Sequence, residues 1–380
     1  MAAIAITGAR GFVGTNLRVR LQELGHADIR PVPHTADDAT IRDALSGVAT
    51  IFHLAGVNRP DDPAEFESGN AGLAAKLCAL AAEVAPGAAI IFSSTTQAAI
   101  DNPYGRSKKA AEDILLGHGR ATGCDVTIFR LTNVFGKWSR PNYNSAVATF
   151  CHNIARDLPI AVNAPGASLN LVYIDDVVSA LIAQIDPTTR TVGFAEAGPV
   201  YATTVGEVAK LIESFRDGRR SLVTERVGTG LIRALYSTYV AALPPERFSY
   251  SVPMHSDPRG TFVEMLKTPD CGQFSFFTAH PGVTRGEHYH HSKTEKFLVI
   301  SGKAEFRFRH IETGQMHRIE TTGGNAEIVE SVPGWTHNIT NIGDDLLIVM
   351  LWANEIFDRD NPDTIGLKVV PVALDEASEV

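Results

Sequence analysis

Three histidines and one glutamate, residue types that bind transition metals in many proteins, lie in the last third of the chain. His288 and His290 are separated by one residue, Glu295 follows shortly after them, and His337 comes later. Alternate side chains of a strand point to the same face, so the two histidines can meet a carboxylate and a third histidine at one ion. This donor set suits Zn²⁺, although Fe²⁺, Mn²⁺ and Ni²⁺ accept similar sets. The spacing predicts a divalent-metal site, with zinc as the first candidate.

A tyrosine and a lysine four residues apart, Tyr104 and Lys108, open a predicted helix that runs to about Leu116. Residues at this spacing share one helix face, so the ammonium group can lower the pKa of the phenol. Such a phenol can exchange a proton with an alcohol or ketone oxygen. Ser94 and Thr95 end an upstream strand, and either hydroxyl could bind the same oxygen. The four residues predict a catalytic group for carbonyl chemistry.

Three glycines connect the first predicted strand, Ile4–Thr7, to the first predicted helix, Thr15–Leu24. Gly8 permits a tight turn, Gly11 lets backbone N–H groups approach a pyrophosphate, and Gly14 lets the helix pack closely on the sheet. The N-terminus of the helix then faces the phosphates and favours their negative charge. This strand–turn–helix context predicts a dinucleotide-binding site.

The second predicted strand, Ile29–Val32, indicates which dinucleotide binds. NAD-specific folds often carry an acidic residue after this strand to hold the ribose 2′-hydroxyl. Here His34 follows the strand, Arg10 lies in the glycine loop and Arg30 lies nearby. A 2′-phosphate would therefore meet cations, so we predict NADPH.

The pattern of apolar and turn-forming residues changes after about residue 240. Up to about residue 240, apolar runs alternate with helical stretches, which predicts an α/β, Rossmann-type, doubly wound parallel sheet. After residue 245, short runs are separated by Gly, Pro and Asp turns, which predicts an all-β barrel. We place a reductase domain at 1–245, a barrel domain at 246–370 and a tail at 371–380.

Composition excludes several classes of protein. The 380 residues are 44% hydrophobic and carry a net charge of −9 without a Lys/Arg-rich run, which argues against binding to nucleic acid. The four cysteines form no CxxC pair and predict neither disulfides nor a thiolate site, as in a reducing cytoplasm. No leader peptide and no apolar run long enough to insert into a membrane is expected.

The N-terminal motifs together resemble the extended short-chain dehydrogenase/reductase family, most of whose members act on nucleotide sugars. The resemblance includes three further segments, which are His53-Leu54-Ala55-Gly56, Asn133-Val134-Phe135-Gly136 and Tyr173-Ile174-Asp175-Asp176-Val177. It implies that Tyr104 is the acid, Lys108 its modulator and a cofactor contact, and Thr95 or Ser94 the hydroxyl that binds the reacting oxygen. It also implies that Asn133 contacts the sugar nucleotide. The remaining cofactor contacts would be Gly8, Arg10, Gly11, Phe12, Val13, Gly14, His34, Leu54, Ala55 and Gly56.

The histidine-rich segment resembles the cupin signature, which implies a cupin barrel that binds metal through His288, His290, Glu295 and His337. A closer likeness is to the dTDP-4-keto-6-deoxyhexose 3,5-epimerases. There the histidine that matches His288 is the base that removes the proton beside the ketone. His288 cannot be both a metal ligand and a free proton acceptor, so two alternatives stay open. In one, His290, Glu295 and His337 bind the metal and His288 is the base. In the other, His288 is a ligand and another group removes the proton.

The epimerase likeness also implies substrate contacts. Arg259 would grip the diphosphate, and Glu264 and Arg285 lie in the matching motifs. Arg285 is one of the cations that could stabilise an enolate oxygen at the barrel site.

From end to end, including the segments 136–145 and 235–239, the chain resembles the bifunctional capsular-polysaccharide enzymes of the CapF type. Arg140 and Asn142 of the first segment are predicted to bind substrate. The family implies C3 epimerisation of a UDP-2-acetamido-2,6-dideoxy-4-hexulose in the barrel and then NADPH-dependent reduction at C4. The product would be UDP-N-acetyl-6-deoxy-L-talosamine, a precursor of UDP-N-acetyl-L-fucosamine, and the enzyme a cytoplasmic homodimer.

Two other interpretations remain. The barrel could be a sugar-nucleotide sensor or dimerisation module attached to a working reductase, although its epimerase-like arginine and histidine argue against this. Alternatively, the chain could be a non-enzymatic NADPH-binding redox sensor, a kind of protein that typically lacks the Tyr–Lys pair.

Overall fold

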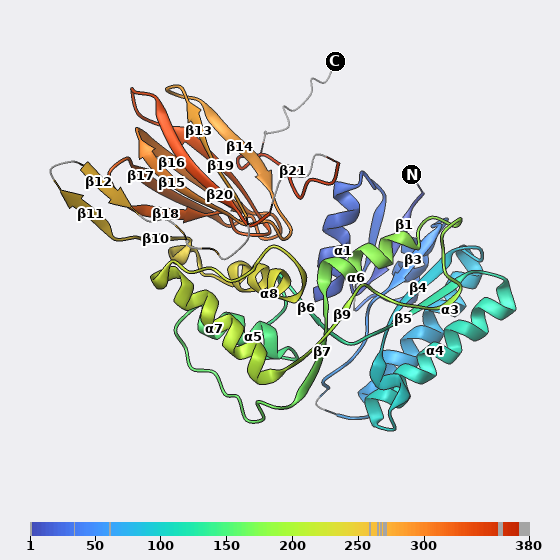
Figure 1. The fold of residues 1–380 in the computed structure, drawn as a ribbon. Coiled ribbons are helices and arrows are strands. Elements are labelled where there is room, and N and C mark those ends of the chain that lie inside the picture. The colour runs from blue at the N-terminus through green and yellow to red at the C-terminus, as the bar shows by residue number, and fades with distance from the viewer. Residues whose placement is uncertain are drawn as a thin grey trace, which may run out of the picture. The chain divides into compact units, whose positions relative to one another are not determined.

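Figure 1 shows the computed structural model of the chain. The structure describes residues 2–33, 35–60, 62–257, 260–263, 266, 268, 272–355 and 360–371. It divides into two compact units, Met1–Phe135 with Leu169–Ala202, and Gly136–Ser168 with Thr203–Val380. The second unit joins the barrel to three helices that precede it. The predicted domain limits at residues 245 and 370 stay predictions.

A six-stranded parallel sheet forms the centre of the first unit, in the order β2-β1-β3-β4-β5-β8. The strand order reverses direction at β1, and ligands of such sheets bind beyond the carboxyl ends of the strands at this point. The strands are β1 (Ile4–Thr7), β2 (Ile29–Val32), β3 (Thr50–His53), β4 (Ala89–Thr95), β5 (Val126–Leu131) and β8 (Gly193–Ala195). A three-stranded sheet adds β6 (Asn133–Phe135), β7 (Ser168–Tyr173) and β9 (Val200–Thr204).

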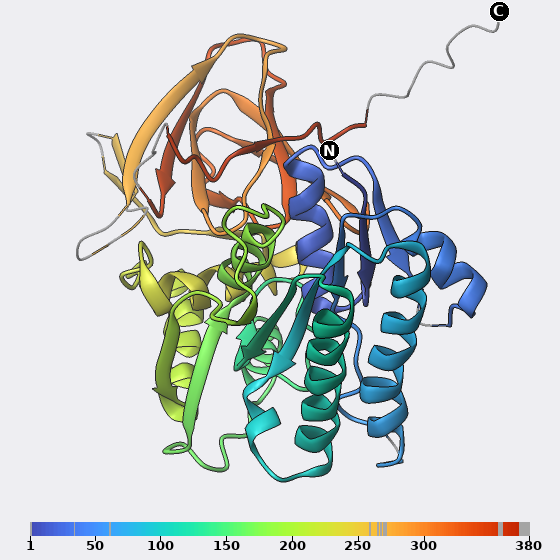
Figure 2. The same ribbon diagram turned by 90° about the vertical axis from the view of Figure 1, so that its right-hand side faces the viewer.

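Helices cover the parallel sheet on both faces. Figure 2 shows α3 and α4 running side by side, and apolar residues of α2, α3 and α4 share one buried core with the strands. Helices α1 and α6 pack against each other. Right-handed connections between the parallel strands place these two helices on the other face of the sheet. The helices are α1 (Phe12–Glu23), α2 (Asp38–Leu45), α3 (Leu73–Val84), α4 (Pro103–Thr122) and α6 (Ile174–Ala183). None of the helices in the described ranges is long and apolar enough to cross a membrane.

Helix α4 carries the Tyr–Lys pair and is longer than predicted. It begins where the Asn102 side chain accepts a hydrogen bond of 2.7 Å from the Gly105 N–H, and it ends at Gly123, which is left-handed. The predicted end at Leu116 was wrong, because Gly119 does not break the helix. A Cβ there would lie 2.9 Å from Val126 Cγ2, so glycine lets the helix pack closely on β5.

The second unit contains two five-stranded antiparallel sheets, in the orders β10-β18-β15-β20-β13 and β17-β16-β19-β14-β21. This arrangement confirms the predicted fold class, a Rossmann-type sheet followed by an all-β cupin barrel. The strands are β10 (Ser249–Ser251), β13 (Gln273–Ala279), β14 (Thr284–Tyr289), β15 (Glu295–Ser301), β16 (Lys303–His310), β17 (Met316–Thr322), β18 (Glu327–Glu330), β19 (Trp335–Asn341), β20 (Leu347–Ala353) and β21 (Ile365–Gly366). A separate hairpin pairs β11 (Met254–Asp257) with β12 (Gly260–Val263). The three helices of this unit, α5 (Ala146–Ile154), α7 (Val205–Ser221) and α8 (Gly230–Ala241), pack on one another.

A buried charge network joins helix α7 to the barrel. Glu330 of β18 accepts hydrogen bonds from Lys296 of β15 and from Arg219 of α7, and all three side chains are largely or fully buried. The Lys296 ammonium also donates to the Tyr250 hydroxyl at 3.0 Å, and the Arg219 guanidinium lies 4.2 Å from the centre of the Tyr250 ring. Burial would raise the pKa of Glu330, but Arg219 and Lys296 hold it below its usual value. The network therefore stays ionised at neutral pH.

Loss of this carboxylate should destabilise the second unit strongly. In Glu330→Ala, two buried cations lose their partner, which costs about 3–5 kcal/mol of unfolding free energy. Tryptophan fluorescence during urea unfolding measures this selectively, because Trp138, Trp335 and Trp352, the only three tryptophans, all lie in the second unit.

The matched control is Glu320→Ala, which removes an exposed partner of Lys303 and Arg318 in the second unit. This change should alter the free energy by less than about 1 kcal/mol. A similar small effect of Glu330→Ala would show that the network does not hold the second unit together.

Candidate reductase and metal sites

The glycine loop is built for close approach of the backbone. Gly8 has a φ of +69°, and a Cβ at this position would lie 2.7 Å from Ala55 N. A Cβ at Gly14 would lie 2.1 Å from the Gly8 oxygen, so only glycine lets α1 start against this loop. Gly11 caps α1, whose first N–H groups, at Phe12 and Val13, have no acceptor within the helix. These features fit the pyrophosphate of a dinucleotide.

The segment after β3 lines the same loop. The Thr7 hydroxyl lies 2.8 Å from His53 Nδ1 and accepts a hydrogen bond of 3.2 Å from the Ala55 N–H, which holds Leu54 and Ala55 against Gly8. A Cβ at Gly56 would lie 3.6 Å from Lys108 Nζ. The structure therefore brings the predicted cofactor segment next to the predicted catalytic lysine.

One of the two arginines near the glycine loop is already paired. Arg30 binds both carboxylate oxygens of Asp28, at 2.8 and 2.7 Å, and the Ser46 carbonyl. The interpretation that a 2′-phosphate would find this cation without a nearby carboxylate was wrong. Arg10 is exposed and remains the cation of the loop. His34 lies outside the described residues.

The two candidate hydroxyls at the end of β4 have different partners. The buried Ser94 hydroxyl donates to Glu112 Oε1 at 2.6 Å, and Glu112 also accepts two hydrogen bonds from Arg130. The Thr95 side chain instead forms a hydrogen bond with Tyr104. The structure thus brings Thr95 and Tyr104 together and directs Ser94 into a buried network.

Lys108 follows Tyr104 by one turn of α4 and is almost fully buried. Its ammonium donates to the Ser93 carbonyl at 2.8 Å and lies 4.1 Å from the centre of the Phe92 ring. Burial lowers the pKa of Lys108 to about 7, although Glu112 opposes the shift.

The phenol of Tyr104 is not acidified as the sequence suggested. Burial raises the pKa of Tyr104, and the hydrogen bond with Thr95 only partly offsets this. Because the Lys108 charge is directed to Ser93, the predicted lowering of the Tyr104 pKa by Lys108 was wrong. A phenol that stays protonated at neutral pH is suited to donate a proton to a ketone oxygen.

The four predicted metal ligands converge in the barrel. One donor atom from each of His288, His290, Glu295 and His337 lies within 4.8 Å of the other three. His288 on β14 pairs with His337 on β19 across a bulge after Gly286, while Glu295 begins β15. His290 Nε2 and His337 Nε2 lie 3.1 and 3.4 Å from Glu295 Oε2. Tetrahedral ligands at about 2.1 Å from Zn²⁺ are about 3.4 Å apart, so the cluster fits an ion after small movements.

Burial and charge around the cluster differ between its members. His290, Glu295 and His337 are buried, whereas His288 is half-buried. Burial alone would raise the pKa of Glu295, but the two buried histidines hold it well below its usual value. Burial lowers the pKa of His288 to about 4 and also lowers that of His337. At neutral pH, Glu295 is thus ionised and His288 and His337 are neutral, as metal binding requires.

Asp363 supports the cluster and was missed from the sequence. Its carbonyl oxygen lies within hydrogen-bonding distance of His290 Nδ1, and its carboxylate accepts the backbone N–H groups of His291, Ser292 and Lys293 at 2.7–2.8 Å. It thereby fixes the turn between two ligands, as outer partners of metal sites do. No sequence motif marks it, because it lies far along the chain from the histidines.

The predicted substrate-binding residues that the structure describes each have a partner of their own. The Arg285 guanidinium donates to the Thr278 carbonyl at 3.2 Å. Asn133 donates to the Asn170 carbonyl at 3.1 Å, Arg140 lies 5.2 Å from the centre of the Tyr143 ring, and the Asn142 N–H donates to the Thr149 hydroxyl at 3.0 Å. Arg259 and Glu264 lie outside the described residues.

Comparisons with known proteins agree with this architecture. Residues 4–191 match the NAD dependent epimerase/dehydratase family, and residues 255–365 match the polysaccharide biosynthesis C-terminal domain. The UDP-2-acetamido-2,6-beta-L-arabino-hexul-4-ose reductase of Pseudomonas aeruginosa is 57% identical over 366 residues, which are 96% of this chain and 98% of that protein. The chain belongs to the CapF family.

Solved structures of this family cover nearly the whole chain. The capsular polysaccharide assembling protein CapF from Staphylococcus aureus is 39% identical with a TM-score of 0.66, and the alignment covers 97% of this chain and 100% of that one. A structure of CapF with the inhibitor 3-isopropenyl-tropolone is 36% identical with a TM-score of 0.62, over 97% and 100% of the two chains. Members of the CapF family thus consist of an extended short-chain reductase fused to a C-terminal β-domain. That this chain belongs to the family supports a nicotinamide cofactor and reductase activity.

Because Ser94 and Thr95 have different partners, removing the Thr95 hydroxyl should lower activity, whereas removing the Ser94 hydroxyl should lower stability. If Thr95 binds the reacting oxygen, as the sequence predicts, Thr95→Val should lower kcat of ketone reduction by about 100-fold, because that oxygen loses a hydrogen-bond donor. Steady-state NADPH oxidation measures this.

The matched control is Ser94→Ala, which removes one buried hydrogen bond and should cost about 1 kcal/mol of stability with kcat changed by less than about threefold. The opposite result, a large kcat loss in Ser94→Ala and none in Thr95→Val, would exchange the two roles.

Proposed function

We propose that this CapF-family chain is a bifunctional nucleotide-sugar enzyme. Its barrel epimerises C3 of a UDP-2-acetamido-2,6-dideoxy-4-hexulose, and its N-terminal domain then reduces the C4 ketone with NADPH to UDP-N-acetyl-6-deoxy-L-talosamine. The single observation that carries the proposal is the 57% identity to a UDP-4-keto-sugar reductase over nearly the whole chain. The Tyr104–Thr95 pair and the histidine–glutamate cluster supply suitable groups for the two steps.

In the reduction, Tyr104 donates the proton that the ketone oxygen needs, and Thr95 holds that oxygen in place by a hydrogen bond. Lys108 anchors the base of the site through the Ser93 carbonyl and reaches the cofactor segment at Gly56. The glycine loop of Gly8, Gly11 and Gly14 would hold NADPH, which would supply the hydride. Arg10 is the residue that favours the 2′-phosphate, since it is the exposed cation of that loop.

In the epimerisation, a C–H bond next to the ketone must become acidic. His288, His290, Glu295 and His337 would hold a divalent ion, and the donor set favours zinc. Such an ion stabilises negative charge on the ketone oxygen. We assign His288 as a ligand, since its donor atom lies within 4.8 Å of those of the other three residues. The residue that removes the proton is then not one of these four.

The order of the two steps follows from the chemistry of the ketone. The C3 proton is acidic only while C4 is a ketone, so epimerisation must precede reduction. The barrel therefore acts first. We propose the same substrate, a UDP-linked keto sugar, for both sites.

A second candidate function for the barrel is a dimerisation module, and exposed apolar residues favour it. Strand β13 is an edge of its sheet, and Phe274 and Phe276 are 49% and 73% exposed, next to Met350 of β20. A homodimer would bury such a surface. The two roles are compatible, and we propose a homodimer of bifunctional chains.

Solvent exchange separates the two activities. In deuterated water without NADPH, the wild-type protein should exchange C3–H of the keto sugar, and Tyr104→Phe should keep this exchange. The same variant should lose NADPH oxidation by about 10²–10⁴-fold, because the proton donor is gone. NMR of the sugar and NADPH absorbance measure the two rates.

The reciprocal control is His337→Ala, which should abolish exchange and still reduce a sugar that has already been epimerised. If exchange required NADPH, or persisted in His337→Ala, the barrel would not be the epimerase and the dimerisation role alone would stand.

Metal analysis tests the role of His288. If it is a ligand, His288→Gln should weaken metal binding by at least about tenfold, as is typical even for outer partners of a site. The control is His291→Gln, which changes a neighbouring histidine outside the cluster. Normal metal content in His288→Gln together with lost exchange would instead identify His288 as the base.

A further inference from the structure

The segment 137–142 carries an indole in an unusual backbone position. Trp138 has a φ of +68°, in the left-handed region that few non-glycine residues adopt. Lys137 beside it is buried, with its ammonium 5.5 Å from the centre of the indole ring. The same segment contains Arg140 and Asn142, the substrate-binding candidates of the reductase. A strained aromatic residue in such a segment indicates that its position matters.

The indole packs against one glycine of the barrel. A Cβ at Gly334 would lie 2.9 Å from Trp138 Cζ2 and 3.0 Å from Trp138 Nε1. Gly334 also has a φ of +80°. Both the space and the backbone conformation therefore require glycine, and the indole lies in direct contact with its Cα.

This glycine connects two members of the histidine cluster. Its N–H donates to the His290 carbonyl at 3.0 Å, and its carbonyl accepts the Ile311 N–H at 3.1 Å. It stands just before β19, the strand that carries His337. A shift of Gly334 would therefore change the spacing between His290 and His337.

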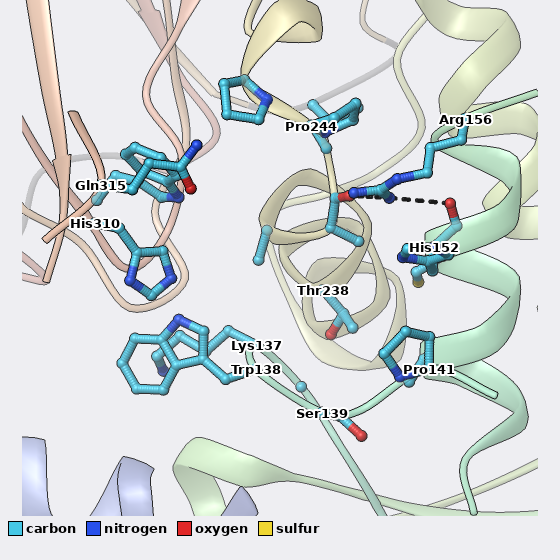
Figure 3. A pocket seen from close by; sticks show the side chains of 18 residues that line it. Lys137, Trp138, Ser139, Pro141, His152, Arg156, Thr238, Pro244, His310 and Gln315 are labelled. Carbon is cyan, nitrogen blue, oxygen red and sulfur yellow. Dashed lines mark hydrogen bonds between the residues drawn. The ribbon is translucent and has the colours of Figure 1, made fainter. Parts of the chain in front are cut away.

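Trp138 also contacts an aromatic cluster of the barrel. The centre of its ring lies 5.9 Å from the centre of the His310 ring. The His310 ring centre in turn lies 5.1 Å from the ring centre of Trp335. The same residues line a cavity of about 250 Å³ (Figure 3), which His152 of α5 and Arg156, just after that helix, border from the opposite wall. Without the indole, Gly334 would border open space in place of a rigid surface.

We propose that Trp138 is a positioning residue for the barrel's metal site. Through Gly334 it fixes the distance between the ligands His290 and His337, and it makes the barrel site depend on a segment that belongs, by sequence, to the reductase. The inference rests on the proposed metal site and deepens the proposed epimerase function. The sugar-binding segment and the metal site are then coupled by direct contact.

The test compares Trp138→Ala with Trp138→Phe and with Gln315→Ala, which lines the same cavity and is exposed. Competition with a chelator gives the affinity for Zn²⁺, and the visible spectrum of the Co²⁺-loaded protein reports ligand geometry. Trp138→Ala should weaken Zn²⁺ binding by about 10–100-fold, change the Co²⁺ spectrum and slow C3 exchange by a similar factor. Trp138→Phe should restore most of these values, and Gln315→Ala should match the wild type.

Each outcome decides the matter. Unchanged Zn²⁺ affinity and Co²⁺ spectrum in Trp138→Ala would overturn the inference, and so would a wild-type protein that binds neither metal. If Trp138→Ala does not fold, Trp138→Leu takes its place in the same comparison. Equal metal binding by Trp138→Leu and Trp138→Phe would then contradict the inference. Absence of C3 exchange in a wild type that binds metal would reject the proposed epimerase alone, since the metal measurements still test Trp138.

Discussion

A single buried carboxylate, Glu330, is shared by two buried cations where helix α7 meets the barrel. An ionised group inside a protein is costly unless its partners are held in place, so Lys296 and Arg219 cannot move far from it. The contact lies within the unit that contains the barrel and the helices α5, α7 and α8, although α5 falls in the stretch that matches the epimerase/dehydratase family. The contact between Trp138 and Gly334 lies within the same unit.

The two candidate sites are built in different ways. The reductase site uses neighbouring strand ends and one helix, so its parts, Thr95, Tyr104 and Lys108, come from a short stretch of chain. The metal site draws on three antiparallel strands, and its turn is held by Asp363 from much later in the sequence. The first site can form within one parallel βαβ unit, whereas the second needs the whole barrel. The proposed order of reaction joins them, since only a ketone makes C3 acidic.

The sequence predicted the parts of the sites that depend on local spacing. The glycine loop and the histidine–glutamate cluster lie where their patterns indicated, because each pattern follows from the geometry of one turn or strand. The choice between Ser94 and Thr95 could not be predicted, since neighbouring residues of a strand point to opposite faces and only the packing of α4 decides which face is the site. The pairing of Arg30 with Asp28 and the raised pKa of Tyr104 likewise depend on tertiary contacts and burial.

Isotope mapping of the product tests the central claim most directly. Wild-type protein is incubated with the 4-keto sugar nucleotide in deuterated water and with NADPH of natural isotopic content, and the product is analysed by NMR. The account predicts deuterium from solvent at C3 and hydrogen from the cofactor at C4, with C3 inverted in the reduced sugar. A reduced sugar that keeps its original hydrogen and configuration at C3 would contradict it.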